Sequence, residues 1–153
     1  MNLKRQTQVS VFTDNRPGTL SRITRALDKR GITILALAAW GETDHGVVRM
    51  VVDHPRQALH LLGEHGMIAT EAKVLAVELP AGPGTLNKVA GLLGRKGVNV
   101  DYAYGSDPSG DGGGVLMIKV DDLPAAERAI KESALFKRAK KKAPKKKASA
   151  RRK

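Results

Sequence analysis

The spacing of apolar and polar residues predicts a strand and then a helix near the start of the chain. Apolar and polar residues alternate over 7–13, which is typical of a half-buried strand. After a Pro-Gly pair, Leu20, Ile23 and Leu27 recur at the spacing of one helix face. Gly31 is placed to end this helix, and either Asp14 or Asn15 is placed to cap its start.

The following residues predict two further strands, a helix and a last strand. The apolar run Ile32–Trp40 indicates a buried strand, and a polar turn separates it from its hairpin partner. A second short helix and a fourth strand follow, so the order is βαββαβ. These segments are 32–40, 47–53, 55–66 and 67–72.

The same pattern returns later in the chain. Pro17 and Gly18 recur as Pro83 and Gly84, 66 residues on, and the helix stripe recurs at the same offset as Leu86, Val89 and Leu93. A constant offset indicates a duplicated unit. The strands expected in the second copy are 74–80, 98–105 and 114–122.

We therefore expect an α+β protein made of two tandem ferredoxin-like units, each an antiparallel sheet with its helices on one face. The first unit spans 1–72 and the second spans 73–136. The counterpart of the first unit's last strand begins at Leu135, where the sequence turns basic, so this strand is expected to be short or missing.

The net charge of +12 is concentrated at the C-terminus. Residues 137–153 contain 11 of the 27 Lys and Arg and no acid, which leaves 16 basic against 15 acidic residues before them. We expect this segment to be a disordered tail, since it has too little apolar surface to fold alone. It can contribute a weak, sequence-independent contact with nucleic acid.

Several classes of protein are disfavoured by the sequence. The absence of cysteine excludes disulfides and thiolate metal sites, and fits a cytoplasmic location. The longest apolar run is too short to span a membrane. Neither a cofactor motif nor a catalytic constellation stands out, and the glycine-rich segment 105–114 is interpreted as a hairpin tip. The chain is therefore expected to be non-enzymatic.

The strand, Pro-Gly turn, helix, glycine and second strand, found twice at one spacing, resemble the ACT-domain family. The resemblance rests on "VFTDNRPGTL" with "KRGITI" and on "VELPAGPGTL" with "RKGVNV", and covers residues 7–134. It implies a regulatory module that binds a small effector, commonly an amino acid, where two ACT units meet. It also implies a homodimer or higher homo-oligomer and an amino-acid biosynthetic enzyme as partner.

A Pro-Gly turn before a helix suits the carboxylate of an amino acid. The first N–H groups of the helix lack intrahelical partners, and they lie at the positive end of its dipole. Asparagine and aspartate oxygens near the turns can accept from the ammonium group, with Asn15 and Asn99 favoured. The resemblance also brings Tyr102 and Tyr104, which share a sheet face, towards the site. The candidate ligand-binding residues are Asn15, Arg16, Pro17, Gly18, Thr19, Leu20, Gly82, Pro83, Gly84, Thr85, Leu86, Asn99, Tyr102 and Tyr104.

The two turns differ, because Arg16 corresponds to Gly82 and Asn15 to Ala81. One working site, or two unlike sites, is therefore expected. The alternative function is an interaction protein whose ACT units only dimerise, and whose basic tail contacts nucleic acid.

Overall fold

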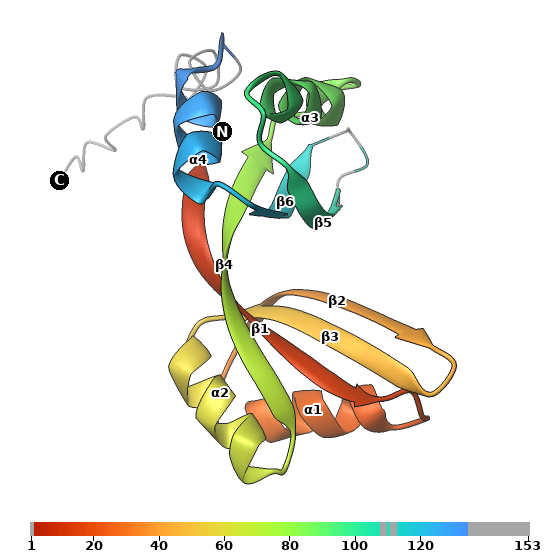
Figure 1. The fold of residues 1–153 in the computed structure, drawn as a ribbon. Helices are drawn as coiled ribbons and strands as arrows, with labels where there is room; N and C mark the ends of the chain where they lie inside the picture. The colour runs from red at the N-terminus through yellow and green to blue at the C-terminus, as the bar shows by residue number, and fades with distance from the viewer. Residues whose placement is uncertain (1, 108–109, 111–112, 135–153) are drawn as a thin grey trace, which may run out of the picture.

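The computed structural model describes residues 2–107, 110 and 113–134. The described residues form six strands and four helices, in the order expected for two similar units (Figure 1). The first part of the chain contains β1 (Leu3–Asp14), α1 (Thr19–Asp28), β2 (Ile34–Glu42), β3 (His45–Val52), α2 (Pro55–Glu64) and β4 (Ile68–Leu79). The second contains α3 (Thr85–Arg95), β5 (Val100–Ser106), β6 (Gly114–Val120) and α4 (Leu123–Glu132). The α+β fold with tandem ferredoxin-like units is confirmed.

All six strands belong to one antiparallel sheet with the order β2-β3-β1-β4-β6-β5. Two long strands, β1 and β4, lie side by side and run through both units (Figure 1). The sequence predicted separate strands at 67–72 and 74–80, and this was wrong, because β4 is continuous across both. The expected boundary at 72/73 falls inside this shared strand.

The first half of β1 occupies the outer strand position of the second unit. It pairs with the second half of β4 from Leu3↔Val77 to Gln8↔Ala72, and Leu3 packs against the core of the second unit. The chain therefore places its N-terminus where a ferredoxin-like unit has its fourth strand. The fourth strand expected near Leu135, and the tail 137–153, lie outside the described residues.

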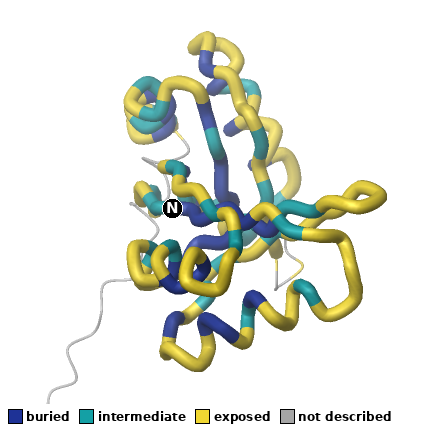
Figure 2. The backbone as a smooth tube through the Cα atoms, turned by 60° about the horizontal axis from the view of Figure 1, so that its bottom comes forward, coloured by how far each residue is buried: buried dark blue, intermediate teal, exposed yellow. Residues whose placement is uncertain are grey.

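The helices of both units cover the same face of the sheet. The first core joins α1 and α2 to β1 and β3, and the second joins α3 and α4 to β4 and β6. A third, smaller cluster lies on the other face, where Val51, Val74 and Met117 are buried. The buried segments follow the central strands and the inner sides of the helices (Figure 2).

The predicted helix stripes are confirmed except at their first positions. Ile23 and Leu27 are fully buried, and Val89 and Leu93 are nearly so. Leu20 and its counterpart Leu86 are exposed instead, since each lies in the first turn of its helix. The expected caps are also corrected: residue Gly18, and neither Asp14 nor Asn15, occupies the N-cap of α1, without a side-chain hydrogen bond.

Both edge strands carry an irregularity at the same place in the repeat. The register shifts between Ile34 and Ala36 in β2 and between Val100 and Tyr102 in β5, again 66 residues apart. Such bulges increase the local twist of a strand. The twisted sheet brings β2 and β5, which are at opposite ends of the strand order, to opposite sides of one cavity on the open face.

Candidate functional site

The first Pro-Gly turn is held at the end of the β2–β3 hairpin. The backbone N–H of Asn15 donates to the carbonyl oxygen of Asp44 at 3.0 Å, and its side-chain Nδ2 donates to the carbonyl oxygen of Thr43 at 3.3 Å. Gly18 has φ +87°, a left-handed conformation that glycine adopts without strain. The turn is thereby fixed between the end of β1 and the start of α1.

A cavity of about 200 Å³ lies at this turn. One wall is the turn itself with the first residues of α1, and the other is formed by the end of β2 and the start of β3. Arg16 and Asp14, which carry opposite charges, both line the cavity beside the positive end of the α1 dipole. Its lining residues from the sequence-based set are Asn15, Arg16, Thr19 and Leu20.

The glycine at the end of β2 fits closely against the turn. A Cβ atom at Gly41 would lie 2.6 Å from Cγ of Asn15, which is closer than such atoms approach. Gly41 therefore lets the Asn15 side chain lie against β2. No local pattern in the sequence singles out this glycine, because the contact joins two segments that are 26 residues apart.

The second Pro-Gly turn has the same backbone form but a different chemistry. Gly84 has φ +78°, close to the value at Gly18, and again caps its helix without a side chain. The hydroxyl of Thr85 is buried and donates to the carbonyl oxygen of Gly82 at 3.1 Å. Thr85 thus closes the turn itself, and Gly82 provides no charge where the first turn has Arg16.

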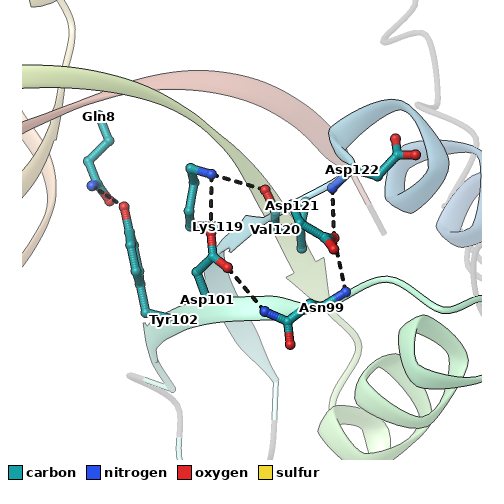
Figure 3. A network of polar contacts seen from close by, with 8 residues as sticks. All are labelled: Gln8, Asn99, Asp101, Tyr102, Lys119, Val120, Asp121 and Asp122. Carbon is teal, nitrogen blue, oxygen red and sulfur yellow. Dashed lines mark hydrogen bonds and ion pairs between the residues drawn. The ribbon is translucent and has the colours of Figure 1, made fainter.

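Asn99 directly precedes β5, within a polar network of its own unit (Figure 3). Its Nδ2 donates to Asp101 at 3.1 Å, and its backbone N–H donates to Asp121 at 2.9 Å. Lys119 is 3.3 Å from the other carboxylate oxygen of Asp101. Because β5 runs parallel to β4, its start lies at the opposite end of the sheet from the Pro83–Gly84 turn. The chain alone does not bring Asn99 to either turn.

Tyr102 and Tyr104 share a sheet face, as predicted, and both contact Gln8 of β1. The Nε2 group of Gln8 donates to the Tyr102 hydroxyl at 2.6 Å, and the Tyr104 hydroxyl donates to Oε1 of Gln8 at 3.0 Å. Gln8 is fully buried, and its Nε2 also donates to Ser10 at 3.1 Å. The tyrosines therefore lie at the junction of the two units and away from both turns.

The profile of the ACT domain pair family matches residues 4–145. This chain belongs to the ACT domain pair family. The protein BT0572 of Bacteroides thetaiotaomicron has a similar structure, with a TM-score of 0.78, 27% identity, and coverage of 86% of this chain and 90% of that one. No curated protein matches the sequence.

Other structures resemble this ACT pair in fold. The ligand-free regulatory subunit of aspartate kinase from Thermus thermophilus has a TM-score of 0.65 at 18% identity, and the match covers 85% of this chain and 95% of that one. A structure of aspartokinase alpha and beta subunits has a TM-score of 0.62 at 17% identity, and the match covers 86% of this chain and 95% of that one. At these identities the likeness extends to the fold alone.

Like Gln8, Arg49 is a junction residue of this ACT pair that no sequence pattern singled out. Arg49 of β3 lies between two aromatic rings, with its Cζ atom 4.0 Å from the centroid of Trp40 and 4.1 Å from that of Tyr102. Its Nε and Nη1 atoms are buried without a hydrogen-bond partner. Trp40 also lines the cavity at the first turn. Arg49 of β3 therefore connects Trp40, in the wall of that cavity, with Tyr102 of β5.

Within the described part of this ACT pair, no group of three or more His, Asp or Glu side chains is arranged to hold a metal ion. In the same residues, no helix is long and apolar enough to cross a membrane.

Proposed function

We propose that this ACT pair is a non-enzymatic regulatory protein of the cytoplasm that binds a small amino acid at its first Pro-Gly turn. The observation that carries the proposal is the 200 Å³ cavity in which Asn15, Arg16 and the start of α1 face the end of β2. The other features of the cavity supply a partner for each part of an amino acid.

The ligand carboxylate is assigned to the start of α1. The helix dipole favours an anion there, as do the N–H groups that follow Thr19, whose own N–H donates to the carbonyl oxygen of Arg16. Arg16 adds a full positive charge in the same cavity. The second turn has Gly82 in place of this arginine, so we assign the effector to the first turn.

The ligand ammonium group is assigned to Asp14 and Asn15. Asp14 lines the cavity and supplies a carboxylate, while the backbone N–H and Nδ2 of Asn15 are already engaged with Asp44 and Thr43. The Oδ1 atom of Asn15 is the acceptor that remains on this side chain. A small side chain suits the size of the cavity.

The proposal includes a second copy of the chain beside β2. This strand is one edge of the six-stranded sheet, and it forms a wall of the cavity. Another ACT unit beside it would enclose the ligand between units, as the family resemblance implies. Occupancy would then favour one arrangement of the homo-oligomer, and an amino-acid biosynthetic enzyme is the partner that would respond to it.

A thermal-shift screen of the twenty amino acids against the full chain tests the proposal. A ligand at about 100 times its dissociation constant adds about 2.7 kcal/mol to the native state. Arg16→Gly, which gives the first turn the residue of the second, should remove the shift. Arg22→Gly, six residues further on and within α1, is the control and should retain it. A flat screen, or a shift that survives Arg16→Gly, contradicts this assignment.

The competing function is an interaction protein with a nucleic-acid-contacting tail. It is favoured by the 11 basic residues of 137–153, which lie outside the described residues. Binding of nucleic acid that falls steeply with salt and is lost on removing 137–153 would support it. The two functions separate because only the effector site depends on Arg16.

A further inference from the structure

A second cavity lies on the open face of the sheet, at the junction of the two units. Its volume is about 470 Å³, which falls within the range of small-molecule sites. The first half of β1 and the second half of β4 form its floor, β5 and β6 one side, and the bulged part of β2 the other. It shares no lining residue with the cavity at the first turn.

The register of the strands explains why the floor is hollow. Lys4, Ala76, Met117 and Tyr104 are paired in one row across four neighbouring strands. The small side chain of Ala76 lies in this row between longer ones. Space is thereby left above β4 on the open face.

Two opposite charges flank this space. Lys4 pairs with Ala76, and Glu78 is two residues further along β4 on the same face, so the two are diagonal neighbours with Cα atoms about 7–8 Å apart. Both side chains line the cavity, and in the described residues no hydrogen bond or ion pair joins them to each other or to another side chain. The cavity therefore offers one free cation and one free anion across a small gap.

The remaining walls are mainly apolar. Leu35 lies at the bulge of β2 and is 54% exposed, so it presents apolar surface that nothing in the described chain covers. Val115 and Met117 of β6 line the other side of the cavity. A ligand suited to this cavity must combine both charges with an apolar group.

We propose that this cavity is a second ligand site, which takes an apolar α-amino acid as its zwitterion. The ammonium group pairs with Glu78 and the carboxylate with Lys4, since these two ligand groups are separated by one carbon and can bridge a diagonal pair. The side chain lies against Leu35, Val115 and Met117. The site takes residues from β1, β2, β4, β5 and β6, so its occupancy joins the two units.

Methionine methyl NMR on the full chain is the experiment. The chain has four methionines: Met117 lines the cavity, Met50 and Met67 belong to the core of the first unit, and Met1 is outside the described residues. Leucine, isoleucine, methionine and phenylalanine are titrated in turn, with Met117→Leu used to assign the signal. A saturable shift of Met117 that leaves Met50 in place is expected for at least one of them.

Ligand analogues and charge variants identify the contacts. Glu78→Gln and Lys4→Met should each weaken binding about tenfold or more, because each removes one charge-assisted contact. The N-acetyl derivative should lose the Glu78 contact and the amide should lose the Lys4 contact. Glu71→Gln, on the same strand but on the helix-covered face, is the matched control and should bind as the parent chain does.

Three results would overturn the proposal. The first is a Met117 signal that none of the four amino acids moves, and the second is a ligand-induced shift that neither charge variant weakens. The third is a Met117 shift that follows protein concentration alone, which would show that a second copy of the chain fills the cavity. Arg16→Gly separates the two sites. This change should remove the effector response at the first turn and leave the ligand-induced shift of Met117 unchanged. The proposal for one site can therefore be contradicted without affecting the proposal for the other.

Discussion

The guanidinium of Arg49, on β3, stacks on the ring of Tyr102, on β5, at 4.1 Å from the ring centroid. These strands belong to different ACT units, and three other strands lie between them in the sheet order. This contact therefore forms only when the two units keep their relative positions. Trp40 covers the other side of the guanidinium at 4.0 Å.

A double-mutant cycle with Arg49→Met and Tyr102→Leu should give a favourable coupling of about 0.5–2 kcal/mol, as expected for a cation near an aromatic face. Urea unfolding of the four proteins measures it. The cycle is needed because Arg49→Met also removes two buried N–H groups without partners, and this opposes the loss of stacking. Additive effects of the two changes would show that the junction contact contributes nothing.

Gly41→Ala should weaken effector binding at the first turn about tenfold, through displacement of Asn15. The new Cβ atom would lie 2.6 Å from Cγ of Asn15, and this exposed side chain can move without unfolding the protein. Calorimetric titration with the amino acid found in the screen measures the affinity. Gly63→Ala, which meets nothing within 4 Å, is the control. Equal affinities in both variants would remove Asn15 from the site.

Gly18→Ala and Gly94→Ala should change the free energy of unfolding in opposite directions. Gly18 has φ +87°, so alanine there costs about 1–2 kcal/mol. Gly94 lies in α3 without a positive φ and with open space at its Cβ position, so alanine should add about 0.5–1 kcal/mol. Chemical denaturation distinguishes the two, and stabilisation by Gly18→Ala would contradict the conformation described for the turn.

Stability should fall at high pH because of Tyr104. Burial, followed by the nearby Tyr102, raises the pKa of Tyr104 from 10.0 to about 12, while Arg49 lowers it in part. The neutral phenol is favoured in the folded state. Its contribution is complete below pH 10 and is lost as the pH rises towards 12. Tyrosinate absorbance of wild type and Tyr104→Phe measures this, since the chain has two tyrosines. A Tyr104 that titrates near 10 would contradict it.

Deletion of residues 1–6 should loosen the second ACT unit more than the first. It removes the pairing from Leu3↔Val77 to Gln6↔Val74, the packing of Leu3, and the ion pair of Arg5 with Glu127 of α4. Hydrogen exchange should become faster in β6 and α4, while α1 keeps its protection. Arg5→Ala alone should cost no more than about 1 kcal/mol, because that pair is partly exposed. Equal loosening of α1 and α4 would contradict the assignment of these residues to the second unit.

The helices and the repeat could be predicted because their signals are local. Ile23 and Leu27, and their counterparts 66 residues on, follow the period of a helix face, and the Pro-Gly turns begin both helices. The start of β1 gave no such signal, since Lys4 and Gln6 face the open side and Arg5 reaches a glutamate of α4. One feature of the sequence does indicate that β4 is continuous: neither glycine nor proline occurs between its two halves.

The junction could not be predicted from the sequence. Gln8 bonds residues 94 and 96 positions away, and Arg49 stacks on a ring of another unit. These contacts depend on the twist that brings the two edges of the sheet over its open face. No periodicity in the chain contains that information. Local patterns therefore placed the two turns, whereas the tyrosines that the family resemblance brought towards the site lie at the junction.

The position of β1 also bears on how the protein is made at the ribosome. The outer strand of the second unit is synthesised before every other element of that unit, and it is continuous with the strand that begins the first unit. Once β4 has emerged, its pairing with β1 extends an edge on which β6 can dock. Each later element then adds to structure already present, and the second unit needs no strand after α4 to fill its outer position.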